Sequence, residues 1–368
     1  MPPPTNTRFL VPLIITLLTI VAIIYNWSKL FTPTDLTTAS KNFQVSQYVL
    51  GDARQVEISD EEVYIYAADQ YFRGVSPTQI NFEHPPAGKY LLGLSLKLFN
   101  NVLWINVFAY LLTLISIAVI AKNFSWRPLA TCLALLLFGA NPFVLSHVGV
   151  ALLDTLYMAC LTAFIATLFW PRQTNEKFLF LGVLLGLFMG VKYYFPLIFL
   201  PSAILIYYVL HQRVHWHKPL CALALAGCVY LLGYTTFFVQ GHNLIDWLNF
   251  EKYSFGWRMG DRSMPRGLIW QTLFLGKHTA WWQGAGVYKI EPAWNFTLPI
   301  YFLSAIVSLV ILLRKNCLSW TVWIFGSVIL LPLLAYTIGS GSELRLLLLI
   351  FPFLCLIIGM AAANFKKP

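Results

Sequence analysis

The feature that most constrains this chain is a series of long apolar runs. Of its 368 residues, 58% are hydrophobic and 11% are charged, whereas an ordinary soluble domain has roughly 25% charged residues. A helix that crosses a bilayer needs about 20 mainly apolar residues, and the chain supplies about ten runs near that length. They are residues 9–25, 102–120, 128–145, 150–170, 178–191, 195–210, 219–239, 298–313, 317–338 and 346–363. The sequence therefore predicts an all-α polytopic membrane protein.

The positions of the basic residues predict its orientation. If the runs alternate regularly, one side of the membrane collects most of the short-loop cations, and cytoplasmic loops are the ones enriched in Lys and Arg. These residues are Arg8, Lys122, Arg127, Arg172, Lys177, Arg213, Lys218, Arg314, Lys315, Lys366 and Lys367. We therefore expect cytoplasmic termini in a plasma (inner) membrane. The net charge of +10 is attributed to contact with anionic membrane lipids, and nucleic acid is not an expected partner.

Two connections are too long to serve only as turns, residues 26–101 and 240–297, and both are predicted to lie outside the cell. We expect one membrane domain over residues 1–368 with no soluble carboxy-terminal domain. In the first loop, helical spacing of apolar residues predicts an amphipathic surface helix from Asp60 to Tyr71. A second, interfacial helix is expected over residues 88–99, where lysines interrupt a leucine-rich stretch.

The first loop also carries most of the candidate chemistry. Asp60, Glu61 and Glu62 are followed by Glu83-His84-Pro85-Pro86-Ala87-Gly88-Lys89, so acids, a histidine and a lysine share one loop beside the membrane. The metal-binding pattern DxD does not occur. Adjacent carboxylates are the groups that could hold a hard cation here, and we predict no required metal or other cofactor.

These residues resemble the superclass C glycosyltransferases that use polyprenyl-phosphate sugars, namely protein O-mannosyltransferases and lipid A aminoarabinose transferases. The double-proline motif after an acid and a histidine carries most of the resemblance. Further matches are Leu152-Leu153-Asp154-Thr155, Gly190-Val191-Lys192-Tyr193, and Arg345 with the residues up to Pro352. One position departs, because Gly149 stands where the protein O-mannosyltransferases usually have an arginine, five residues before Asp154.

The resemblance implies that Asp60 is the base that takes the proton of an acceptor hydroxyl while this oxygen attacks the sugar. Glu61, Glu83 and His84 are its candidate catalytic neighbours, and Asp154 and Tyr193 are candidate supporting residues. The departing phosphate needs positive charge beside it. Lys192 and Arg345 are the predicted phosphate ligands, because they are the basic residues of the short outward connections, and Lys89 is a further candidate.

Each assignment has a structural alternative. Lys192 and Arg345 could extend to lipid headgroups, or pair with Asp154 and Glu343. The acids at 60–62 could merely favour a helix amino-terminus, and His84 could belong to a turn set by the prolines that follow it. The second loop mixes aromatic and basic residues suited to sugar stacking or to an interfacial belt. They are Trp247, Tyr253, Trp257, Trp270, Trp281, Trp282 and Trp294, with Arg258, Arg262, Arg266 and His278.

The sequence thus favours an outward-facing, inverting glycosyltransferase with a polyprenyl-phosphate sugar donor and a lipid, glycan or protein acceptor. A transporter or flippase is the first alternative, but such proteins typically show two related halves with broken helices at the bilayer midplane, and no duplication is visible. A noncatalytic membrane scaffold is the second.

Overall fold

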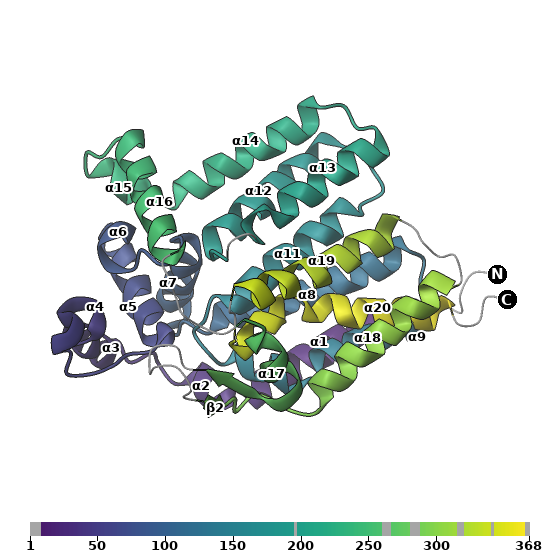
Figure 1. Cartoon of the computed structure of the whole chain (residues 1–368), viewed down its shortest axis with the longest axis horizontal. Helices are drawn as coiled ribbons and strands as arrows, with labels where there is room; N and C mark the ends of the chain where they lie inside the picture. The colour runs from purple at the N-terminus through teal and green to yellow at the C-terminus, as the bar shows by residue number, and fades with distance from the viewer. Residues whose placement is uncertain are drawn as a thin grey trace.

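The computed structural model describes residues 9–194, 197–259, 266–279, 288–314, 320–339 and 342–364. Helices make up nearly all of it (Figure 1). Several residues named above lie outside the described part: Arg8, Arg262, Trp281, Trp282, Lys315, Lys366 and Lys367, together with the side chain of Arg258.

A bundle of apolar helices forms the body of the protein, and each predicted run contains at least one of them. The bundle consists of α1 (Leu10–Tyr25), α8 (Trp104–Asn123), α9 (Pro128–Gly139), α10 (Pro142–Val148), α11 (Asp154–Leu168), α12 (Asn175–Val191), α13 (Leu200–Gln212), α14 (His217–Leu232), α18 (Thr297–Arg314), α19 (Trp320–Ile338) and α20 (Phe351–Asn364). Short 3₁₀ turns, η3 (Leu197–Phe199) and η5 (Leu344–Leu349), precede α13 and α20.

Three of the described helices, α8, α18 and α19, are long and apolar enough to cross a membrane alone. Helices α9 and α10 add a fourth if they count as one span, because they are bent by 59° at a short break. The break has a local cause, since Pro142 cannot continue the helix and the Asn141 side chain accepts a hydrogen bond from the N–H of Phe143. The chain is a multi-pass membrane protein, and ten spans with cytoplasmic termini stay a prediction.

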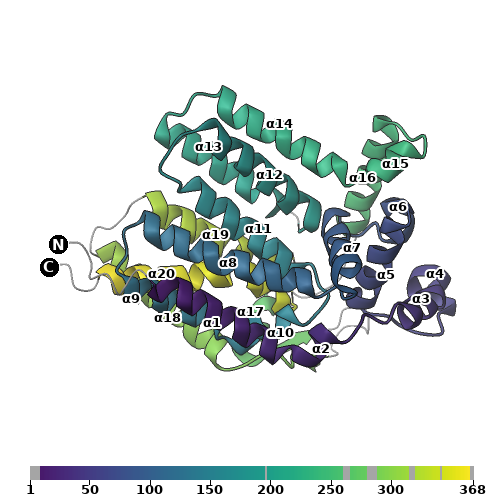
Figure 2. The ribbon, with the colours of Figure 1, turned by 180° about the vertical axis from the view of Figure 1, so that it is seen from behind.

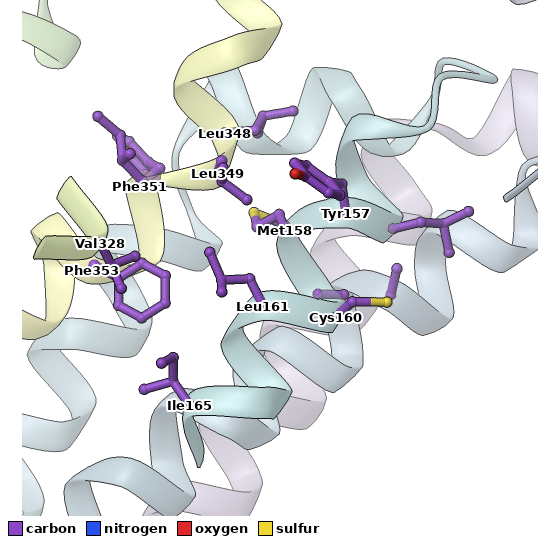
Figure 3. Packing of buried hydrophobic residues seen from close by; sticks show 14 of the residues in the cluster. Tyr157, Met158, Cys160, Leu161, Ile165, Val328, Leu348, Leu349, Phe351 and Phe353 are labelled. Carbon is purple, nitrogen blue, oxygen red and sulfur yellow. The ribbon is translucent and has the colours of Figure 1, made fainter. Parts of the chain in front are cut away.

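Helix α11 is the centre of the bundle and is buried along almost its whole length. Helix α11 packs against η5, and Met158 of α11 lies beside Leu349 of η5 (Figure 3). Because α11 is enclosed by other helices, Asp154 at its first position is held by a rigid support.

Helices α12 and α14 pack through small residues. A Cβ added to Gly182 or Gly186 would lie 2.6 Å from the backbone oxygen of Ala222 or Ala226, respectively. Backbones can approach this closely only where side chains are absent or small, as in other small-residue helix pairs. The contact brings the outer end of α14 beside the end of α12, where Lys192 follows.

The first long loop folds into short helices gathered at one end of the bundle (Figures 1 and 2). They are α2 (Trp27–Phe31), α3 (Leu36–Gln44), α4 (Gln47–Leu50), η2 (Gly51–Ala53), α5 (Asp60–Phe72), α6 (Pro77–Ile80) and α7 (Ala87–Phe99). Helices α5 and α7 match the two helices predicted here. Helix α7 packs tightly on α5 through Gly93, whose added Cβ would meet Ala68 O at 2.6 Å, while Leu94 and Leu98 of α7 are exposed. Its interfacial position stays a prediction.

The second loop contains α15 (Thr235–Val239), α16 (Leu244–Met259), α17 (Leu268–Leu275) and a hairpin of β1 (Lys277–Thr279) and β2 (Tyr288–Ile290). The strands are antiparallel, with Lys277 opposite Ile290 and His278 opposite Lys289. Helices α15 and α16 lie at the same end of the molecule as the first loop (Figure 1). The hairpin is a small addition to a fold predicted as purely helical.

Candidate active site

Three consecutive acids open α5, and their roles differ. The Ser59 hydroxyl accepts a hydrogen bond from the N–H of Glu62, and the Glu62 carboxylate accepts one from the N–H of Ser59 at 3.0 Å, which is a capping box. The Glu61 carboxylate accepts from the N–H of Ala151 at 2.8 Å, in the turn before α11. Glu62 therefore caps its own helix, and Glu61 connects the first loop to the bundle.

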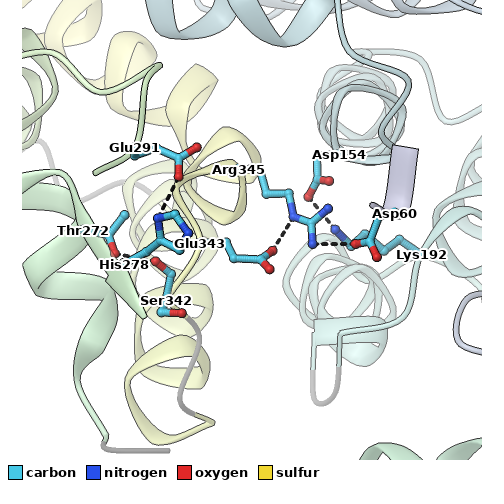
Figure 4. A network of polar contacts seen from close by, with 9 residues as sticks. All are labelled: Asp60, Asp154, Lys192, Thr272, His278, Glu291, Ser342, Glu343 and Arg345. Carbon is cyan, nitrogen blue, oxygen red and sulfur yellow. Dashed lines mark hydrogen bonds and ion pairs between the residues drawn. The ribbon is translucent and has the colours of Figure 1, made fainter. Parts of the chain in front are cut away.

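Asp60 is paired with Arg345, a residue from near the other end of the chain. Nη2 of Arg345 lies 2.7 Å from Oδ2 of Asp60, and Nε of Arg345 donates to Glu343 (Figure 4). Burial opposes the charge on Arg345, but the carboxylates of Glu343 and Asp60 outweigh burial and raise the pKa of the guanidinium. The arginine is therefore a fixed positive charge beside the candidate base.

The second candidate cation, Lys192, is paired with Asp154. Its Nζ lies 2.6 Å from Oδ1 of Asp154, and the two side chains are 5% and 6% exposed. Oδ2 of Asp154 is buried and has no hydrogen-bond partner among the described residues. Both predicted phosphate ligands thus pair with the acids that the sequence offered as their alternative partners, and Figure 4 shows the two pairs close together.

The double-proline motif packs the first loop against the bundle, next to these two ion pairs. A Cβ added to Gly233 would lie 2.9 Å from Cγ of Pro86, and one added to Gly190 would lie 3.0 Å from Cβ of Ala87. A Cβ on Gly88 would meet the side chain of Leu153 at 2.8 Å and that of Val191 at 3.3 Å. Since Leu153 precedes Asp154 and Val191 precedes Lys192, this motif helps to position both members of the second ion pair.

Lys89 points into the first loop. Its side chain is fully buried, and Nζ donates to the backbone oxygens of Asn81 at 3.2 Å and His84 at 2.6 Å. The amine also lies 5.7 Å from the centre of the Tyr64 ring. These contacts hold the segment that carries Glu83 and His84, which is a structural use of Lys89 beside its predicted phosphate contact.

One residue near the site had no signal in the sequence. Tyr48, on α4, is half-buried, and its phenol is hydrogen-bonded to Glu83. Burial, followed by the negative charges of Glu83 and Asp60, raises the pKa of this phenol. Tyr48 therefore stays protonated near these two acids and is hydrogen-bonded to Glu83. It reaches them because α3 and α4 fold back over α5, which no local pattern predicts.

The departure at Gly149 also has a structural explanation. A Cβ at this position would lie 2.1 Å from Oδ1 of Asn26, and the Lys29 amine donates to the Gly149 carbonyl at 3.0 Å. The Asn26 amide donates to the carbonyl of Leu145 at 2.9 Å. The end of α1 thus occupies the space that any side chain at residue 149 would need.

The hairpin adds a polar pair that the sequence analysis did not assign. His278 Nδ1 lies 2.9 Å from a Glu291 carboxylate oxygen, with side chains 11% and 20% exposed. Thr272 on α17 donates to the carbonyl of Ser342, next to Glu343. Figure 4 places this group on the opposite side of Arg345 from Lys192. Within the described ranges, no group of three or more His, Cys, Asp or Glu residues could hold a metal ion.

The sequence of this chain is similar to a known family over part of its length. A family model described as dolichyl-phosphate-mannose-protein mannosyltransferase matches residues 83–235, a stretch that begins at Glu83 and includes Asp154 and Lys192. A search of curated proteins finds no match.

Two solved structures are similar to the whole chain. ArnT from Cupriavidus metallidurans bound to undecaprenyl phosphate matches with a TM-score of 0.61 and 16% identity. The same protein in its apo state matches with a TM-score of 0.57 and 16% identity. Each match covers 96% of this chain and 60% of the ArnT chain. The chain therefore has the fold of ArnT, and the matching family model agrees with the resemblance that its sequence indicated.

Proposed function

We propose that this protein transfers a sugar from a polyprenyl-phosphate donor to the hydroxyl of a lipid, glycan or protein acceptor, at the outer face of the plasma membrane. The observation that carries the proposal is the ion pair between Asp60 and Arg345, with Lys192 and Asp154 beside it. A carboxylate that could act as the base lies in this group with two cations. The undecaprenyl phosphate in one ArnT structure supports a carrier of that class.

In the proposed reaction, Asp60 accepts the proton of the acceptor hydroxyl as this oxygen bonds to the anomeric carbon. The bond between that carbon and the phosphate oxygen breaks in the same step, so the configuration inverts and polyprenyl phosphate leaves. A positioned base contributes typically 10²–10⁴-fold to the rate of such a step. No metal ion is needed for this proton transfer.

Arg345 and Lys192 stabilise the negative charge on the leaving phosphate. A guanidinium has more N–H donors than the contacts to Asp60 and Glu343 use, so Arg345 can bind a phosphate oxygen while it still touches Asp60. Fixed cations in a site with little water stabilise developing charge strongly. Glu61 and the Pro85-Pro86 motif keep the first loop, and therefore Asp60, in place on the bundle.

The test is glycosyl transfer by purified protein in liposomes, with a panel of polyprenyl-phosphate sugars and a count of the polyprenyl phosphate released. Asp60→Asn should reduce turnover about 10²-fold or more. The matched control is Asp52→Asn, the same change at an exposed acid of the same loop, which should leave turnover unchanged. Full activity of Asp60→Asn would remove the assigned base, and a native protein that consumes no donor would remove the transferase proposal.

A further inference from the structure

Side chains of the segment that carries Lys192 contact three neighbouring helices. Helix α12 ends at Val191, and Lys192 has the extended backbone angles φ −151° and ψ 139°. Each of the three residues 192–194 contacts a different helix. Lys192 pairs with Asp154 on α11, Tyr193 donates to Glu251 on α16, and the Tyr194 ring packs edge-on against Tyr336 on α19 at 4.6 Å. These side-chain contacts therefore help to set the position of Lys192.

Glu251 is the contact that comes from the second outer loop. It lies in the middle of α16, and its carboxylate accepts hydrogen bonds from the hydroxyls of Tyr193 and, at 3.0 Å, Tyr230. Tyr230 belongs to α14 and is 7% exposed. A carboxylate that accepts from two phenols forms charge-assisted hydrogen bonds, which are roughly twice as strong as neutral ones. Glu251 thus joins α16, α14 and the Lys192 segment at one point.

The next turns of α16 are attached to the first outer loop. The Ser254 hydroxyl donates to the backbone oxygen of Phe82 at 2.8 Å. The Phe82 ring lies 5.4 Å from the ring of Tyr253 and 5.1 Å from that of Trp257. Phe82 directly precedes Glu83. One helix therefore holds the first-loop side of the site through Phe82 and the phosphate side through Tyr193.

We propose that Glu251 is a positioning residue, which fixes Lys192 through Tyr193 and thereby sets the affinity for the donor phosphate. This inference rests on the proposed function only for the part that concerns the donor. The mechanical part, that Glu251 holds the 192–194 segment in place, can be tested without any substrate.

The first experiment measures how fast an amine-reactive acetylating reagent modifies Lys192, followed peptide by peptide with mass spectrometry on purified full-length protein. Lys177 is an internal control, because it is also buried and contacts Trp170 and Tyr208 at the far end of α12. In Glu251→Ala, Lys192 should be modified about tenfold faster, as expected for the loss of a hydrogen bond to a charged group, while Lys177 stays protected. Unchanged protection of Lys192, or an equal rise at Lys177, overturns the proposal.

The second experiment separates donor binding from chemistry. Glu251→Ala should raise the donor KM about tenfold and change kcat less than about twofold, and Glu251→Gln, which keeps one acceptor for a phenol, should recover part of the loss. The double variant Glu251→Ala/Tyr193→Phe should be no worse than the poorer single variant, since both single changes remove the same hydrogen bond between Tyr193 and Glu251. Glu57→Gln, a change at another exposed acid of the first loop, is the matched control for Glu251→Gln.

The outcomes are distinct for the two proposals. A fall in kcat at constant KM, or multiplied effects in the double variant, contradicts the positioning role of Glu251. If the native protein consumes no donor but Lys192 is still acetylated faster in Glu251→Ala, the proposed function fails while the mechanical role of Glu251 stands.

Discussion

Replacing Lys192 tests whether this residue serves only in a structural ion pair or also binds the donor phosphate. Its side chain and that of Asp154 are 5% and 6% exposed, and their charged atoms are 2.6 Å apart. Lys192→Met removes the cation and leaves a buried carboxylate whose second oxygen already has no hydrogen-bond partner among the described residues. Breaking a buried pair from one side costs about 3–5 kcal/mol. We therefore expect Lys192→Met to lower the free energy of unfolding by about that amount.

A second, double variant removes both charges of the pair. Leu has the same branching as Asp, so Asp154→Leu combined with Lys192→Met replaces the pair with apolar groups of similar shape. Such replacements are often neutral or stabilising, and the double variant should unfold within about 1 kcal/mol of the native protein. Its glycosyl transfer should still be reduced about 10²-fold or more, because the leaving phosphate loses a fixed cation.

Both quantities can be measured on the same preparations, by unfolding titrations in mixed detergent micelles and by transfer assays in liposomes. Native activity in the stable double variant would refute the assignment of Lys192 as a phosphate ligand and leave it a purely structural residue. A cost below about 1 kcal/mol for Lys192→Met would refute the conclusion that this variant leaves Asp154 as a buried, uncompensated charge.

Three further results are expected. Ser59→Ala removes the capping box of α5 and should cost about 1 kcal/mol in thermal unfolding with transfer retained; loss of transfer in the folded variant would mean that the cap is part of the chemistry. Gly149→Ala places a Cβ 2.1 Å from Oδ1 of Asn26 and should cost about 1–3 kcal/mol, largely recovered by adding Asn26→Ala, whereas a neutral single change would contradict the close approach. Arg345→Lys keeps the charge but cannot reach Asp60 and Glu343 with separate nitrogens in a fixed fork; transfer should fall about tenfold or more, and native rates would show that a point charge suffices.

Local patterns predicted the local structure well. The acids of residues 60–62 and the spacing that follows predicted the helix that the structure has as α5, because a helix amino-terminus and an apolar face are properties of neighbouring residues. The same reasoning predicted a helix within each apolar run. It missed the 59° bend between α9 and α10, although Asn141-Pro142 is a local signal for a helix end.

Long-range pairs were only partly predictable. Asp60 and Arg345 were both named as site residues, but nothing in the sequence indicated that they touch, because they are 285 positions apart. Glu251 and Tyr48 were not found, since a single acid among aromatic residues and a tyrosine in a loop have no distinctive spacing. Such residues gain their roles from the way α16 and α4 pack, and packing partners are not encoded in a local window.

The arrangement of charges links the two halves of the proposed reaction. Three carboxylates, Asp60, Asp154 and Glu343, hold the two cations Arg345 and Lys192 in place, so the cations are fixed before any phosphate arrives. When Asp60 takes the proton of the acceptor it becomes neutral, and its attraction for Arg345 falls. In the same step the leaving phosphate gains negative charge. The guanidinium can therefore strengthen its contact with the phosphate as its contact with Asp60 weakens, which stabilises the transition state more than the bound substrates.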